Sequence, residues 1–162
     1  MSKARVYIET SVVSYLTARP SSDLLAAARQ KATSDWWFLQ KDRFDLCTSE
    51  VTLEEAAGGD RAAAALRIDA LTNIPRLAVT QAVVTLSKAL VEGGALPAKA
   101  LGDSLHIAVS AVHGVDYLLT WNCRHIDNAE LKPVIRRICT AHGYASPEIC
   151  TPHELMGGPE DA

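Results

Sequence analysis

Short apolar segments typical of strands alternate along the chain with longer segments of helical spacing, and this alternation constrains the fold more than any other feature. Residues 5–8 form a β-branched and aromatic run that does not alternate with polar residues, which indicates a strand buried on both faces. Further strands are predicted at 44–48, 76–79, 117–120 and 149–150. Helices are predicted between these strands. Four of them are expected to begin after a capping residue, at Ser21 or Ser22, Ser49, Asp60 and Thr80, and two more are predicted over 98–113 and 131–142.

Strands separated by helices favour a parallel sheet, because a parallel crossover needs roughly a dozen residues and usually takes a helix. We therefore predict an α/β fold, a three-layer α/β/α sandwich with a central, mainly parallel sheet. The length of 162 residues fits one domain, expected to span 1–156. Residues 157–162 are rich in glycine and acidic residues and are expected to form a frayed tail.

Composition excludes several classes of protein. Sixteen basic against nineteen acidic residues give a net charge of −3, so any binding of nucleic acid must be local. No apolar run is long enough to span a bilayer or to serve as a signal peptide, so we expect a cytoplasmic protein without membrane association. The four cysteines are too scattered for paired zinc ligands and too few for a disulfide scaffold, and reduced thiols are expected.

Polar side chains gather where the predicted strands end, and in an open parallel sheet these ends border the binding crevice. The residues concerned are Glu9, Thr10 and Ser11 after the first strand, Glu54 or Glu55 after the second, and Thr120 and Asn122 after the fourth. Oxygen ligands are therefore expected to accumulate at one edge of the sheet.

Asp103 adds a further acid from the long helix at 98–113. It precedes an otherwise apolar helix face, where a carboxylate is costly unless it is paired or bound to a metal. Several carboxylates and an amide brought together would repel one another, and a divalent cation would relieve that repulsion. Such oxygen ligands suit Mg²⁺ or Mn²⁺, and the chemistry indicated is metal-assisted hydrolysis of a phosphodiester.

Four motifs in this order resemble the PIN domain (PilT N-terminus) family, in its VapC-type toxin ribonuclease group. The motifs are residues 6–11 (VYIETS), 48–55, 103–108 (DSLHIA) and 118–122 (LLTWN). The resemblance covers residues 5 to about 150. It implies an α/β/α sandwich, an endoribonuclease that depends on Mg²⁺ or Mn²⁺, and a homodimer neutralised by a cognate antitoxin protein.

Carried over residue by residue, the resemblance places the three metal-binding acids at Glu9, Glu55 and Asp103, and the fourth polar position at Asn122. Glu55 is preferred to Glu54 because of its spacing from Ser49 and from the following glycines. Two departures stand out. The first position is usually Asp rather than Glu, and the fourth is often acidic rather than Asn.

Each of these residues also has a plain structural interpretation. Glu9 could cap a helix, Glu54 or Glu55 could be an ordinary acid near a helix start, and Asp103 could pair with Lys99 on the same helix. Asn122 could stabilise a turn. His106 could orient a carboxylate or a phosphate, although a lone histidine on an apolar helix is more often a core residue.

Two functions are compatible with these residues. The first is a metal-dependent endoribonuclease acting on RNA, in which Thr10, Ser11 and Thr120 support the ligands and Arg124 contacts a phosphate. The second is a catalytically weak or inactive domain of the same fold that binds RNA or a protein, and it is favoured by the departures at Glu9 and Asn122.

Overall fold

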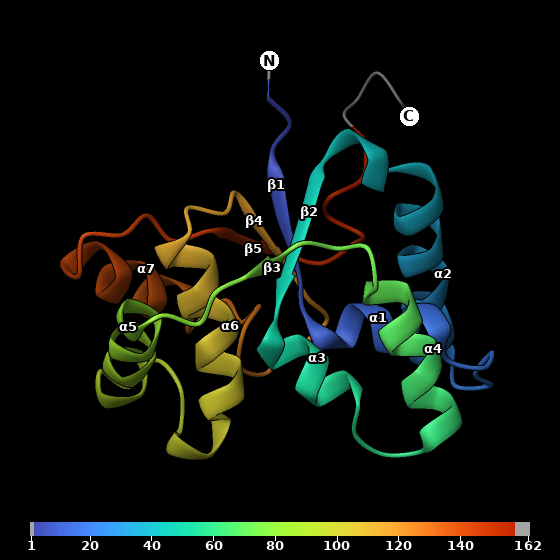
Figure 1. Ribbon diagram of the computed structural model, residues 1–162, viewed down its shortest axis with the longest axis horizontal. Helices are drawn as coiled ribbons and strands as arrows, with labels where there is room; N and C mark the ends of the chain where they lie inside the picture. The colour runs from blue at the N-terminus through green and yellow to red at the C-terminus, as the bar shows by residue number, and fades with distance from the viewer. Residues whose placement is uncertain (1, 158–162) are drawn as a thin grey trace.

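The computed structural model describes residues 2–157, and in these the chain forms five strands and seven α-helices (Figure 1). The strands are β1 (Arg5–Ile8), β2 (Asp45–Ser49), β3 (Arg76–Leu77), β4 (Tyr117–Leu119) and β5 (Glu148–Cys150). The helices are α1 (Thr10–Thr17), α2 (Leu24–Leu39), α3 (Glu50–Ala56), α4 (Arg61–Leu71), α5 (Gln81–Glu92), α6 (Leu101–Val112) and α7 (Lys132–Ala141). The predicted tail lies outside the described residues except for Gly157.

The five strands form one parallel sheet in the order β3-β2-β1-β4-β5. β1 is central, and its Val6 is in register with Leu46 of β2 on one side and Tyr117 of β4 on the other. The chain builds outward from β1 through β2 to β3, then returns to β4 on the opposite side. The boundary between β1 and β4 is therefore the point where the strand order reverses, and ligands of open α/β sheets bind outside the strand ends at such a point.

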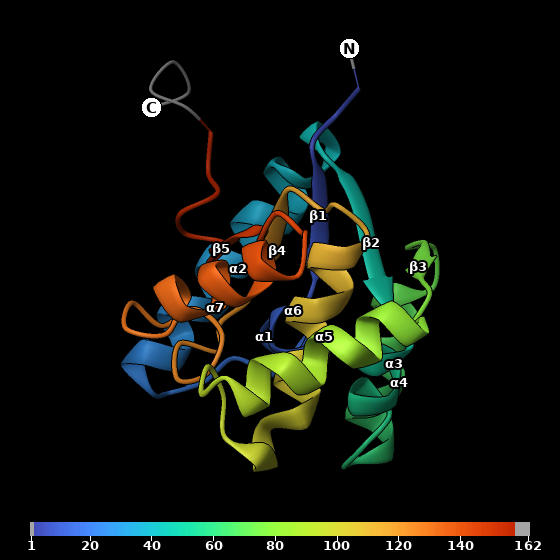
Figure 2. The same ribbon diagram turned by 90° about the vertical axis from the view of Figure 1, so that its left-hand side faces the viewer.

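Helices cover both faces of the sheet, which confirms the predicted three-layer arrangement. Figures 1 and 2 show α5, α6 and α7 on one face, and α1, α2 and α4 on the other. Side chains alternate across β1, so Tyr7 packs with the first group of helices while Val6 and Ile8 pack with the second. Each face thus has its own hydrophobic core, and the central strand contributes to both.

Several predicted elements differ in detail from the structure. Helix α1, directly after Glu9, was not predicted, and Asp23 rather than Ser21 or Ser22 caps α2 by accepting from the Ala26 amide. The predicted helix at 98–113 begins as a 3₁₀ turn, Ala98–Ala100, before α6. The caps at Asp60 and Thr80 are confirmed by hydrogen bonds from Ala63 and Val83.

Among the described residues, no helix is both long and apolar enough to cross a membrane.

Candidate functional site

Glu9 lies at the carboxyl end of β1 and is only 5% exposed. One carboxylate oxygen accepts hydrogen bonds from the Ser11 hydroxyl and from Thr120 Oγ1, at 2.6 Å for the latter. The other oxygen accepts from the Ser11 amide at 3.1 Å, so Glu9 also caps α1. The capping interpretation and the strand-end position both hold, and three donors fix this buried carboxylate.

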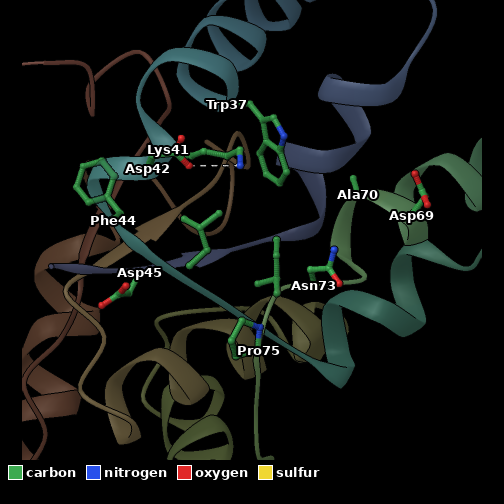
Figure 3. Close-up of a pocket in the computed structure, with 11 residues that line it drawn as sticks. Trp37, Lys41, Asp42, Phe44, Asp45, Asp69, Ala70, Asn73 and Pro75 are labelled. Carbon is green, nitrogen blue, oxygen red and sulfur yellow. Dashed lines mark ion pairs between the residues drawn. The ribbon is translucent and has the colours of Figure 1, made fainter.

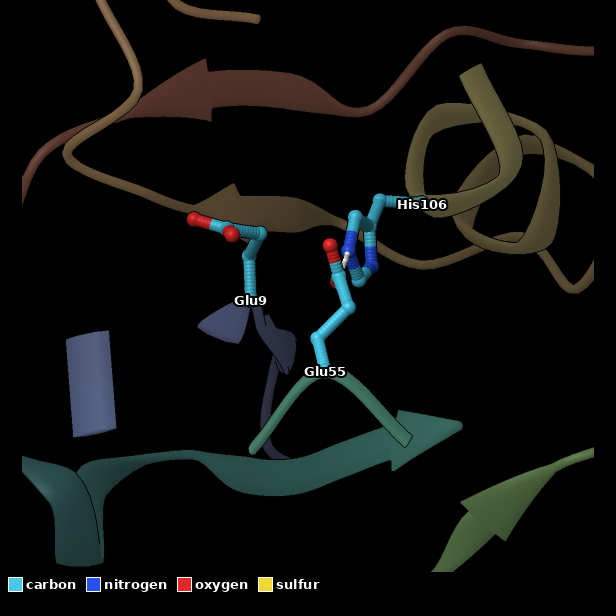
Figure 4. A group of neighbouring side chains, drawn as sticks. All are labelled: Glu9, Glu55 and His106. Atoms are coloured by element: carbon cyan, nitrogen blue, oxygen red, sulfur yellow. Dashed lines mark hydrogen bonds and ion pairs between the residues drawn. The ribbon is translucent and has the colours of Figure 1, made fainter. Parts of the chain in front are cut away.

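Glu55 comes from α3 and points toward the same edge of the sheet (Figure 4). Its Oε1 accepts from Thr10 Oγ1 at 2.8 Å and from Nε2 of His106. Burial by itself raises the pKa of Glu55, but the hydrogen bonds and the charge of His106 outweigh burial and leave the pKa lowered. Glu55 therefore remains ionised below the usual range for a glutamate.

His106 is fully buried in α6, and both of its ring nitrogens have partners. Nε2 bonds to Glu55, and Nδ1 lies 2.8 Å from the hydroxyl of Tyr7. That hydroxyl is also 2.6 Å from Ser49 Oγ and 3.2 Å from Thr52 Oγ1, so a closed polar network lies beneath the acids. Burial alone lowers the pKa of His106, but Tyr7, Glu55 and Glu9 together raise it to about 10. The raised pKa favours the protonated form of the ring.

The ligand atoms of Glu9, Glu55 and His106 all lie within 4.8 Å of one another. Figure 4 shows the Glu55 carboxylate against the His106 ring, with Glu9 beside them and its carboxylate turned away from the pair. A protonated ring with both nitrogens engaged donates hydrogen bonds and does not coordinate a metal. The two carboxylates are therefore the groups that could hold a hard cation, and His106 supplies a positive charge that relieves their repulsion.

Asp103 lies outside this close group. Its Oδ2 accepts from Nδ1 of His125 at 3.0 Å, and this pair takes the place of the partner considered from sequence, Lys99. The residue before it, Gly102, lies against Glu55, since a β-carbon placed there would be 3.4 Å from Glu55 Oε2. The start of α6 thus borders the site through Gly102, whereas the Asp103 carboxylate is bonded to His125.

Asn122 and Arg124 follow β4. The Asn122 side-chain oxygen accepts from the amides of Arg124 and His125, which is the turn interpretation considered from sequence. The backbone N–H of Asn122 donates to Thr120 Oγ1 at 2.9 Å, so this turn helps to hold Thr120 against Glu9. Arg124 is exposed beside it.

Glu54 is exposed on the other side of α3, where it lines a separate cavity with Glu50 and Arg76. A further cavity of about 510 Å³ lies at the amino end of β2, between Trp37, Asp45, Asn73 and Pro75 (Figure 3). None of the predicted site residues lines this second cavity. Of the two glutamates weighed from sequence, Glu55 is thus the one at the site.

No protein-family model matches the chain, and a comparison with curated proteins finds no relative.

Tyr7 was not among the residues predicted for the site. The interpretation of His106 as a core residue is confirmed by its complete burial, and its ring also contacts the Glu55 carboxylate. A signal was present for both, because a tyrosine in a strand buried on both faces needs a partner for its hydroxyl, and a histidine on an apolar helix needs partners for its ring nitrogens. Only the fold shows that each supplies the partner of the other.

Proposed function

We propose that this protein is an endoribonuclease that hydrolyses RNA phosphodiesters with the help of Mg²⁺ or Mn²⁺. The observation that carries the proposal is the convergence of Glu9 and Glu55 within 4.8 Å, at the point where the strand order reverses. Two carboxylates held this close at a strand-end crevice favour a divalent cation.

Glu9 and Glu55 would hold the ion, and the resemblance to PIN domains adds Asp103, which lies outside the close group and is paired with His125. A bound divalent cation supplies Lewis-acid stabilisation of a phosphate oxygen and lowers the pKa of water. Ser11 and Thr120 hold the Glu9 carboxylate in place, while Thr10 and His106 hold Glu55. Such fixed ligands need no rearrangement when the reaction begins.

One basic residue, Arg124, follows the turn after β4 and suits an RNA substrate. Arg124 lies exposed two residues beyond Asn122, where its guanidinium can contact an RNA phosphate. The overall charge of −3 makes such local contacts necessary.

The resemblance to PIN domains extends the proposal to the biology of the protein. On that resemblance we propose a cytoplasmic toxin of a type II toxin–antitoxin pair, which forms a homodimer and is restrained by a cognate antitoxin protein. Copurification with the product of the neighbouring gene would support this assignment, and a chain that is harmless when expressed alone would contradict it.

A second function is favoured by one specific observation. Both oxygens of Glu9 and Oε1 of Glu55 already accept hydrogen bonds, and His106 balances part of their charge. The cluster is therefore stable without a metal, as expected of a catalytically weak or inactive module that binds RNA or a protein.

Cleavage of RNA with Mn²⁺ or Mg²⁺ distinguishes the two functions. We expect Glu9→Gln to lower the rate at least about 100-fold, since it keeps the shape of the side chain but removes a charge facing the reaction. Glu54→Gln is the matched control and should cleave like the wild type. Wild-type protein that binds RNA without cutting it would favour the binding module, and equal rates for Glu9→Gln and wild type would remove the carboxylate from the mechanism.

A further inference from the structure

Arg29 of α2 lies over two aromatic rings beside the proposed catalytic edge. Its guanidinium carbon is 5.4 Å from the centre of the Trp121 ring and 5.8 Å from that of Tyr15, and its Nη1 donates to the Tyr15 hydroxyl at 3.2 Å. The Trp121 indole Nε1 donates to Thr33 Oγ1 at 2.8 Å. The indole is therefore held in one orientation by a hydrogen bond and by a cation–π contact.

Trp121 and Arg29 line a cavity of about 360 Å³. Leu25, Ala28 and Ala32 form its apolar part along α2, and His153 borders it from the segment after β5. The cavity thus offers a flat indole, a planar cation and an apolar surface, and the charged or titratable groups among its lining residues are basic. A nucleobase of an RNA strand matches this chemistry, because it stacks on aromatic and guanidinium planes while its phosphates are attracted by positive charge.

This cavity is linked directly to the acidic site. Trp121 follows Thr120, whose hydroxyl donates to Glu9, and the Trp121 amide donates to Ser11 Oγ at 2.8 Å. Ser11 in turn hydrogen-bonds to Glu9. The backbone that carries the indole is thus held by Ser11, which also positions the Glu9 carboxylate.

We propose that the cavity beside Trp121 and Arg29 binds one unpaired nucleobase of the RNA. The inference rests on the proposed function for its substrate. A base inside a duplex has both faces covered by its neighbours, so only an unstacked base can occupy the cavity.

The test is RNA binding measured by fluorescence anisotropy with EDTA present, so that no cleavage occurs. The probes are a labelled oligouridine and an abasic oligoribonucleotide of the same length. Trp121→Ala should weaken binding of the oligouridine about tenfold or more and leave the abasic strand unaffected. Trp121→Phe should retain most of the affinity. Phe38→Ala is the matched control, since Phe38 is a 74% exposed aromatic of the same helix α2 that does not line the cavity.

Photocrosslinking of the unaltered protein keeps the test valid if Trp121→Ala fails to fold. Oligonucleotides containing 5-bromouridine should crosslink to the peptide that carries Trp121. Crosslinks only to other peptides, or equal affinity of wild type and Trp121→Ala for the oligouridine, would overturn the proposal. So would a Trp121→Ala variant that binds RNA normally but no longer binds a protein partner.

The outcomes separate this inference from the nuclease itself. Base-dependent binding at Trp121 without any metal-dependent cleavage would support the cavity and reject the nuclease. Cleavage by Trp121→Ala with unchanged kcat and KM would support the nuclease and reject the cavity.

Discussion

His106 donates its Nε2 proton to the Glu55 carboxylate from a fully buried position in α6. The pair joins α6 to α3 on the edge of the sheet and is continued through Nδ1 to the hydroxyl of Tyr7. A buried cation of this kind stabilises the protein only while it is protonated, and its acid partner only while it is ionised.

The pair predicts a specific dependence of stability on pH. Because the pKa of His106 rises from 6.5 to about 10 on folding, its contribution is fully present below about pH 6.5 and is lost as the pH rises through 10. The slope should reach at most about 1.4 kcal/mol per pH unit in that window. Because the pKa of Glu55 is lowered, its contribution is present above about pH 4.5 and is lost on further acidification.

Urea unfolding of wild type and His106→Gln at several pH values between 6 and 10 measures this effect. The difference between their free energies of unfolding should change by at most about 1.4 kcal/mol per pH unit. The thiols that are buried in the folded protein ionise near pH 9 once the chain unfolds, and they do so in both proteins, so the difference between the two curves isolates His106. Parallel curves would show that His106 is neutral in the folded protein.

Tyr7→Phe should destabilise the protein by about 1–3 kcal/mol, because it leaves the buried His106 Nδ1 without its partner and also removes the contact with Ser49. Tyr144→Phe, at a half-buried tyrosine packed against the same core, is the control and should change stability much less. The free energy of unfolding in urea gives both values. Equal effects would argue that the Tyr7 hydroxyl has no special role.

A divalent cation should stabilise the folded protein through Glu9 and Glu55. At Mn²⁺ a hundred times its Kd, the gain is about 2.7 kcal/mol, or roughly 5–10 °C in Tm for a domain of this size. Glu9→Gln and Glu55→Gln should lose the shift, and Glu54→Gln should keep it. A shift of the same size in all four proteins would place the metal elsewhere.

Asp103→Asn should lower metal-dependent RNA cleavage about 100-fold while changing stability by no more than about 1 kcal/mol, because its pair with His125 is partly exposed. Cleavage kinetics and thermal unfolding of the same preparation give the two quantities. If stability falls and cleavage does not, the carboxylate serves only to hold the loop after β4.

The thiols should differ sharply in reactivity. Burial raises the pKa of Cys47 and Cys139 to about 11 and that of Cys150 to about 12, whereas Cys123 is exposed. Ellman's reagent should therefore modify Cys123 first in the native protein and the other three only on unfolding. Rapid reaction of all four without denaturant would contradict the described core.

The sequence predicted which segments form strands and that the sheet is parallel, because strands show local patterns and helices separate them; it did not predict the order of the strands in the sheet. Residues 5–8 are apolar without alternation, and a strand of this kind in a chain with intervening helices occupies the centre of a parallel sheet. Helix α1 was missed because Glu9, Thr10 and Ser11 were interpreted as strand-end ligands, although Glu9 is also its cap.

The positions of Glu9 and Glu55 at the site could be predicted from the sequence. Glu9 and Glu55 follow strands, and topology alone brings strand ends together. The bonds of His106 to Tyr7 and of Asp103 to His125 join side chains far apart in sequence, and no local pattern specifies such pairs. His125 in particular lies in a turn whose path is set by Asn122.

The bond between Thr120 and Glu9 joins residues 111 positions apart, each directly after one of the two neighbouring strands β4 and β1, of which β1 is synthesised earlier. A nascent chain that has emerged from the ribosome only as far as α6 already carries all three acids but lacks the strand that fixes the first of them. Full assembly of the carboxylate cluster must therefore wait until β4 has been synthesised and has docked beside β1.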